Sequence, residues 1–326
     1  MNSAYQIFFT PLAAAGISTG ILIVLLRCPG LLVDHPNQRS LHLTPVPRTG
    51  GIAIVCGMLV AVALLLPDYA TFGMGALAIA IVSLIDDWRR LHPLPRFGAQ
   101  GVIAAAFCGF GLGQLSIAEG IFLVLAIVWL ANLYNFMDGS DGLAGGMSLI
   151  GFSACAGGAW IGGSPPLTML CGSIAAASLP FLAINFHPAR IFMGDIGAVT
   201  LGFAAAAIGA IGWREGVWSP FFPVFAFSPF IADASLTLMR RILKKEKFWR
   251  PHNEHYYQKL VRMGLGHRST ALIEYAVMAI SAAGALATFY MEGTTQLAVI
   301  VVWGALLMFA ANRIDRRWLM FQGGAR

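Results

Sequence analysis

Long apolar runs alternate with short polar or glycine- and proline-rich breaks along the whole chain. Eleven of these runs approach the length of about 20 residues that an α-helix needs to cross a bilayer. We expect membrane spans near residues 5–27, 51–66, 70–85, 97–113, 120–135, 143–161, 167–185, 196–212, 220–239, 270–290 and 295–311. The pattern predicts an all-α, polytopic transmembrane helical bundle of about 11 spans, built as a single integral membrane domain over residues 1–326.

Lysine and arginine fall almost entirely on one side of this predicted bundle. If the spans alternate in direction, 20 of the 21 Lys and Arg residues share a side with the 28–50 loop, and only Arg214 lies on the other. Because basic residues concentrate in cytoplasmic loops, we expect the long loops and the C-terminus in the cytoplasm and the N-terminus outside. This topology is typical of a multi-pass protein of the inner (cytoplasmic) membrane.

Composition supports a membrane protein and excludes a nucleic-acid-binding one. Hydrophobic residues make up 58% of the chain and charged residues 11%, whereas soluble domains contain about 25% charged residues. The net charge of +6 belongs to the predicted cytoplasmic face, where it suits anionic lipid headgroups or phosphorylated substrates. The sequence contains no DNA- or RNA-binding motif.

The stretch NLYNFMDGSDG, residues 132–142, places polar side chains at the end of an apolar run. Asp138 and Asp141 are three residues apart, a spacing that puts both on one side of a helical turn. Asn132 and Asn135 share that spacing one turn earlier. Polar side chains at membrane depth are costly and indicate a functional site by default. Helix termination by Asn and Asp-Gly explains one or two of these residues, but not four.

Three further aspartates fall at the same predicted face. Asp86 and Asp87 are adjacent at the end of a span, and neighbouring carboxylates resist joint ionisation unless a cation compensates; a solvated pair beside Arg89 and Arg90 is the alternative. Asp195 opens another span between two glycines. Oxygen ligands without cysteine suit Mg²⁺, or Mn²⁺ in its place, but magnesium commonly takes only one or two carboxylates. Other aspartates would then position substrate.

The last large loop, residues 240–269, is the most basic. His252 and His255 are three residues apart and lie close to Arg250. These side chains suit phosphate binding. A zinc site and a loop that anchors to anionic lipid are the alternatives.

Together and in this order, the motifs resemble those of the polyprenyl-phosphate N-acetylhexosamine-1-phosphate transferases. That family includes the phospho-MurNAc-pentapeptide transferase of peptidoglycan synthesis and the enzymes that start O-antigen. The matching segments are DHPNQRSLHLTPVPRTGG, IDDW, NLYNFMDGSDGLAGG, IFMGDIGAVTLGF and the HNEH loop. The peptidoglycan enzymes carry consecutive histidines where this chain has HNEHYY. The departure favours the antigen-initiating branch, with UDP-GlcNAc or a deoxy-N-acetyl relative as donor.

The resemblance implies transfer of an N-acetylhexosamine-1-phosphate from a UDP-sugar to polyprenyl (undecaprenyl) phosphate at the cytoplasmic membrane face, with release of UMP and a requirement for Mg²⁺. It implies catalytic roles for Asp86, Asp87 and Asp141, and metal binding by Asp195 and Asp141. The expected substrate-binding residues are Arg48, Asn135, Asp138, Arg250, His252 and His255. Expected partners are the UDP-sugar, the lipid phosphate and the membrane, but no nucleic acid, with a homodimer left open.

A secondary transporter is the alternative from a different class of function. Transporters place polar residues near the bilayer midplane between inverted repeats. Here only Asp233 and Glu274 fall near span interiors, both close to the predicted cytoplasmic ends, and the sequence shows no inverted repeat. The distribution of acidic residues therefore favours a membrane enzyme.

Overall fold

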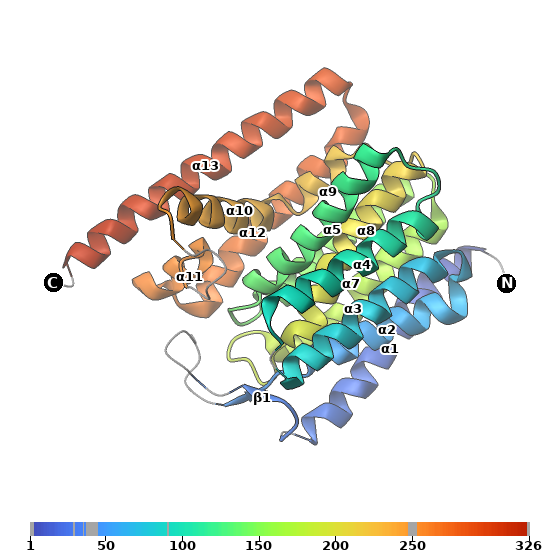
Figure 1. The fold of residues 1–326 in the computed structure, drawn as a ribbon, viewed down its shortest axis with the longest axis horizontal. Helices are drawn as coiled ribbons and strands as arrows, with labels where there is room; N and C mark the ends of the chain where they lie inside the picture. Colours follow the sequence, from blue (N-terminus) through green and yellow to red (C-terminus); the bar gives the residue numbers. More distant parts are fainter. Residues whose placement is uncertain are drawn as a thin grey trace.

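The computed structural model describes residues 3–28, 30–34, 36, 45–89, 91–246 and 253–324, which are almost wholly helical (Figure 1). Its helices are α1 (Ser3–Leu26), α2 (Gly50–Leu65), α3 (Ala70–Arg89), α4 (Pro93–Gly111), α5 (Ile117–Met137), α6 (Leu143–Ile161), α7 (Pro165–Asn185), α8 (Gly194–Arg214), α9 (Phe221–Ala226), α10 (Ser228–Leu243), α11 (Tyr256–Leu260), α12 (Gly266–Ala287) and α13 (Gly293–Gly324). Shorter elements are β1 (Val33–Asp34), β2 (Val46–Pro47), η1 (Pro67–Tyr69), η2 (Val261–Leu265) and η3 (Thr288–Tyr290). The predicted all-α class is confirmed.

Eight helical segments in the described part of the chain are long and apolar enough to cross a membrane. They are Ile7–Leu26, Pro67–Arg89, Ile117–Met137, Leu143–Ile161, Pro165–Asn185, Gly194–Arg214, Tyr256–Tyr290 and Gly293–Gly323. A shorter apolar helix covers Gly50–Ala63. These segments support a polytopic membrane protein, while the total of eleven spans and the sidedness of the termini stay predictions.

The predicted span over 220–239 is not one helix. The chain breaks at Phe227 between α9 and α10. Pro229 lies in the first turn of α10, where its missing N–H costs no helical hydrogen bond. Because α10 also contains Asp233, Arg240 and Arg241, it is more polar than the helices around it.

Helix α8 forms the centre of the bundle, and α13 lies at its outer edge. In the apolar stretch of α8, 89% of the residues are buried, whereas in that of α13 only 6% are buried. In Figure 1, α13 runs along the outside beyond α10, while α8 lies among its neighbours. The composition of α8 explains this place, because its many Ala and Gly residues let neighbouring membrane helices approach closely.

Helix-capping residues fix where the helices around the aspartates begin. Ser116 and Glu119 form a reciprocal capping box at the start of α5, which satisfies backbone N–H groups that a helix start leaves unpaired. Pro93 and Pro165 begin α4 and α7, a position where proline is favoured. Since α3 and α5 end where α8 begins, the three meet at one end of the bundle, near β1 and β2.

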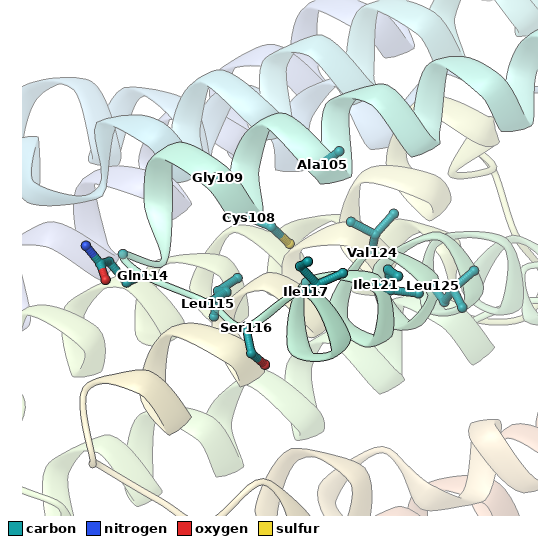
Figure 2. Close-up of a pocket in the computed structure, with 12 residues that line it drawn as sticks. Ala105, Cys108, Gly109, Gln114, Leu115, Ser116, Ile117, Ile121, Val124 and Leu125 are labelled. Atoms are coloured by element: carbon teal, nitrogen blue, oxygen red, sulfur yellow. The ribbon is translucent and has the colours of Figure 1, made fainter.

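An open apolar groove lies at the opposite end, between the C-terminal half of α4 and the N-terminal half of α5 (Figure 2). Its volume is about 660 Å³. The lining includes Cys108, Ile121, Val124 and Leu125. Its lining residues include no carboxylate, so this groove is not where we expect metal binding or phosphoryl transfer.

Candidate functional site

The first polar loop and the start of α8 are joined through their backbones. Gly50 N–H donates to the carbonyl of Phe192 (2.9 Å), and Gly51 N–H donates to that of Met193 (2.9 Å). A Cβ on Gly51 would lie 2.3 Å from the Cα of Gly197. The glycines of the two motifs therefore allow a contact too close for any side chain, and this contact brings Arg48 to the start of α8.

Asp87 lies where this junction meets the end of α3. Arg48 Nη2 donates to the Asp87 carbonyl (2.7 Å), and Arg48 Nη1 lies 3.5 Å from Asp87 Oδ1. Asp87 Oδ2 accepts from Ile196 N–H in the first turn of α8 (3.2 Å). Helix starts favour such anions. Oδ1 is buried and has no hydrogen-bond partner among the described residues, so its charge is balanced by the ion pair with Arg48.

Arg96 connects Asp86 to Asp195. Its Nη1 lies 2.9 Å from Asp86 Oδ2 and 3.8 Å from Asp195 Oδ2. Leu91 N–H donates to the other Asp86 oxygen (2.7 Å). From the sequence, Arg96 is one of the basic residues of the predicted cytoplasmic face. Pro93 could have indicated that Arg96 lies near the Asp86–Asp87 pair, because a new helix starts at this proline and folds back toward the pair.

Asp138 follows α5 directly and belongs to the same cluster. The Gly194 N–H donates a hydrogen bond to its carboxylate. Burial, and then the nearby charges of Asp195 and Asp87, raise the pKa of Asp138 well above its ordinary value. Desolvation and like charge both disfavour an ionised carboxylate, so this group lies where added positive charge would be stabilising.

Asp141 contacts a different set of residues. Its Oδ2 lies 2.6 Å from His187 Nδ1 and accepts from Ala189 N–H (3.2 Å). Its Oδ1 lies 3.8 Å from His267 Nδ1. The rings of His187 and His267 stack with centroids 5.3 Å apart and an interplanar angle of 4°. Neither histidine was among the predicted site residues, although His267 lies in the basic loop over residues 240–269.

The prediction that Asp138 and Asp141 share one side of a helical turn is wrong. Residues 138–142 form a turn between α5 and α6, in which Asp138 has φ −86° and ψ 37° and Gly142 has φ +75°. Glycine adopts this left-handed conformation without steric cost. The reversal of the chain directs the two carboxylates to different partners.

The two asparagines of this stretch are separated as well. Asn132 Nδ2 donates to Gln100 Oε1 on α4 (2.6 Å) and to the Val128 carbonyl (2.8 Å). Asn135 is half-buried in the last turn of α5, and its carbonyl accepts from Asp138 N–H (3.3 Å). Asn132 therefore connects α5 to α4, while Asn135 stays beside Asp138.

Of the predicted residues in the last loop, Arg250 and His252 lie outside the described residues. His255 is buried, with Nδ1 3.2 Å from Asp233 Oδ1. Asp233 also accepts from the N–H groups of Tyr256 and Tyr257 (3.0 Å each). Asp233 thus holds the start of α11, a role that no motif in the sequence indicates.

The carboxylates at the start of α8 fit a divalent cation that shares its ligands with a substrate. Among the described residues, no three His, Cys, Asp or Glu side chains converge as a ready-made metal cage. Magnesium commonly uses one or two carboxylates and completes its shell with water and phosphate oxygens. The like charges of Asp138 and Asp195 at the start of α8 fit such an ion. Asp141 has only Oδ1 left for one, because His187 and Ala189 contact Oδ2.

Comparisons with known proteins find a matching family and similar chains. Residues 69–212 match the profile described as Glycosyl transferase family 4. The probable undecaprenyl-phosphate N-acetylglucosaminyl 1-phosphate transferase of Bacillus subtilis is 32% identical, over 75% of this chain and 74% of that protein. The decaprenyl-phosphate N-acetylglucosaminephosphotransferase of Mycobacterium leprae is 32% identical (83% and 81% covered). The undecaprenyl-phosphate alpha-N-acetylglucosaminyl 1-phosphate transferase of Escherichia coli K12 is 27% identical (88% and 84% covered).

Proposed function

The chain belongs to the polyprenyl-phosphate N-acetylhexosamine-1-phosphate transferase family, and on this premise we propose that it transfers N-acetylhexosamine-1-phosphate from a UDP-sugar to undecaprenyl phosphate. UDP-GlcNAc is the favoured donor, and the product would start O-antigen or another cell-surface polysaccharide. The observation that carries the proposal is the meeting of Asp86, Asp87 and Asp195 with two arginines, Arg48 and Arg96, at the start of α8.

The reaction exchanges one phosphate–oxygen bond for another. An oxygen of the acceptor phosphate attacks the donor phosphorus that carries the sugar, and a new P–O–P linkage forms. The bridging P–O bond of the donor breaks, and its electron pair leaves with UMP. Catalysis of phosphoryl transfer depends mainly on positioning and charge neutralisation. The acceptor is already largely ionised at neutral pH, since the second pKa of a phosphate monoester is about 6, so a general base is not essential.

The side chains of the site would divide these tasks. Arg48 and Arg96 would neutralise phosphate charge, and they also pair with Asp87 and Asp86. We infer that these two aspartates position the acceptor rather than remove a proton. A bound Mg²⁺ would offset the charge of the diphosphate and assist the departure of UMP. The residues that fit it are Asp195 with Asp138 or Asp141, and Mn²⁺ would substitute.

The place of the site at the helix ends suits two substrates of opposite solubility. The UDP-sugar arrives from water, whereas the acceptor phosphate is attached to a lipid in the bilayer. A site where α3, α5 and α8 meet lies at the helix ends, where we expect both substrates to reach it. The distribution of Lys and Arg supports the cytoplasmic face of the inner membrane as its location.

The test is release of UMP by the purified protein with undecaprenyl phosphate and a panel of UDP-sugars. We expect release with UDP-GlcNAc or a related UDP-N-acetylhexosamine, dependence on Mg²⁺, and loss of activity in EDTA. An Asp68→Asn variant is the matched control, because Asp68 is exposed and outside the candidate site. Turnover of UDP-MurNAc-pentapeptide alone would assign the protein to the peptidoglycan branch. No release with any UDP-N-acetylhexosamine from folded protein would exclude the proposed activity.

A further inference from the structure

We call residues 138–142 the aspartate turn. Three side chains from one later stretch of the chain hold the backbone in and next to this turn. All three come from α11 and α12 and lie outside the segment that matches the family profile. The contacts are Tyr257 Oη donating to the Phe136 carbonyl (3.0 Å), Asp141 N–H donating to His267 Nδ1 (3.3 Å) and Tyr275 Oη donating to the Gly142 carbonyl (2.6 Å). Both sides of the turn are therefore held by side chains, in addition to the backbone hydrogen bonds that Asp138 N–H and Gly146 N–H donate there.

The glycines of the turn make room for the two tyrosines. A Cβ on Gly139 would lie 2.1 Å from Tyr257 Oη, and a Cβ on Gly146 would lie 2.0 Å from Tyr275 Cε1. A Cβ on Gly142 would lie 2.9 Å from Tyr275 Oη. Cβ atoms essentially never approach other atoms within 3.0 Å. The spacing of these glycines is thus explained by the tyrosine rings that pack against them.

Tyr257 is itself held firmly. Its side chain is fully buried, and its N–H donates to Asp233 Oδ2 (3.0 Å). Its ring lies 5.9 Å from that of His255, which lies 5.9 Å from that of Phe136. The stacked rings and the buried carboxylate connect α10 and α11 to the end of α5, immediately before Asp138.

We propose that Tyr257, His267 and Tyr275 are positioning residues for the transfer reaction, and we call them the C-terminal clamp. The proposal rests on the proposed function, since it assigns the clamp to the same site. The aspartate turn carries Asp138 and Asp141 between the ends of α5 and α6. Contacts to its backbone fix where both carboxylates begin without adding a charge, and such supporting contacts hold catalytic geometry in place.

The experiment compares Tyr257→Phe, Tyr275→Phe and the double variant with wild type. Each single change removes one hydroxyl and keeps the packed ring. Because a neutral hydrogen bond contributes modestly, we expect kcat to fall about 3- to 10-fold for each variant, with the KM of both substrates changed less than about twofold. A role in stability alone would lower the folded fraction but not kcat per folded molecule. Tyr290→Phe is the matched control, because Tyr290 is 80% exposed and distant from the turn.

Amide hydrogen exchange over residues 136–146 gives a second measurement that needs no turnover. We expect exchange to accelerate in the two tyrosine variants and to stay unchanged in Tyr290→Phe, because local opening is easier without the clamp. Unchanged kcat, or unchanged exchange, in both single variants would overturn the proposal. A wild-type protein without transferase activity would overturn the proposed function instead. The exchange rates would then still decide whether the clamp holds the turn.

Discussion

The two sides of the candidate site hold their carboxylates in different ways. On one side, which we call the arginine side, Asp86, Asp87 and Asp195 lie within reach of Arg96 or Arg48. On the other, the aspartate turn is fixed through its backbone by side chains from α11 and α12. Arginine charge therefore holds the first side together, whereas packing and hydrogen bonds from hydroxyl and imidazole groups hold the backbone of the second.

This difference predicts unequal responses to substitution. Removing one partner of a buried ion pair leaves an uncompensated charge, at a cost of about 3–5 kcal/mol. Removing one neutral hydrogen bond costs about 0.5–1.5 kcal/mol. The side chains of Arg48 and Arg96 are 25% and 20% exposed. Solvent therefore lowers the cost of breaking their ion pairs, but this cost stays above that of losing a neutral hydrogen bond. Changes on the arginine side are expected to have the larger effects.

Asp87→Asn is expected to have the largest effect on activity. The change keeps the side-chain volume but removes the charge that faces Arg48 and the start of α8. Loss of one preorganised polar group in an active site lowers kcat by about 10²- to 10³-fold, and we expect a value at the upper end. Initial rates of UMP release measure it, with Asp68→Asn as control. Activity within tenfold of wild type would mean that Asp87 is dispensable.

Arg96→Ala should rank second, with a loss of about 10²-fold, because charge-assisted hydrogen bonds are about twice as strong as neutral ones. The variant leaves Asp86 and Asp195 without their shared cation. Arg96→Lys should recover part of the rate, since it restores the charge but not the planar geometry. Arg214→Ala is the matched control, because Arg214 contacts Glu119 and Gln114 at the other end of the bundle. Equal losses in Arg96→Ala and Arg214→Ala would refute a specific role.

The sequence was sufficient to predict the all-α membrane fold and several members of the site. The apolar runs and the scarcity of charge fixed the fold class, and nearly every predicted span corresponds to a helix. The exception, 220–239, contains prolines at 220, 223 and 229, whose effect depends on where the helix starts. Asp86, Asp87, Asp138 and Asp195 came from local motifs, and the structure brings them together around the start of α8.

The residues that hold the aspartate turn could not be predicted, because they are distant in sequence and carry no motif. His267 reaches Asp141 across 126 residues, and Tyr275 reaches Gly142 across 133. From the sequence, Asp233 lies inside one predicted span over 220–239. The structure breaks this span between α9 and α10, and Asp233 contacts the start of α11. Periodicity predicts which residues share a helix face, but not which loop packs against which.

Gly194→Ala tests how closely the arginine side is packed. Gly194 has φ +74°, and a Cβ there would lie 2.4 Å from the Arg48 carbonyl and 3.1 Å from Asp87 Oδ2. We expect unfolding free energy to fall by about 1–3 kcal/mol from backbone strain and kcat to fall about tenfold or more from displacement of Arg48. Gly216→Ala is the matched control, since Gly216 has φ +72° with nothing within 4 Å. Thermal unfolding and UMP release separate the two effects. If both variants lose activity equally, strain explains the loss and contact with Arg48 does not.

His187→Gln should have the smallest effect and gives the sharpest test of the contrast between the two sides. The glutamine amide can still donate to Asp141, and the Ala189 N–H continues to hold the same oxygen. The two tyrosines of the C-terminal clamp bind the backbone around the turn through their own hydroxyls, and only the clamp's His267 stacks on this ring. Because only one hydrogen bond is altered, we expect kcat to fall less than about tenfold. A loss as large as that of Arg96→Ala would show that the aspartate turn also depends on charge, which would remove the distinction between the two sides.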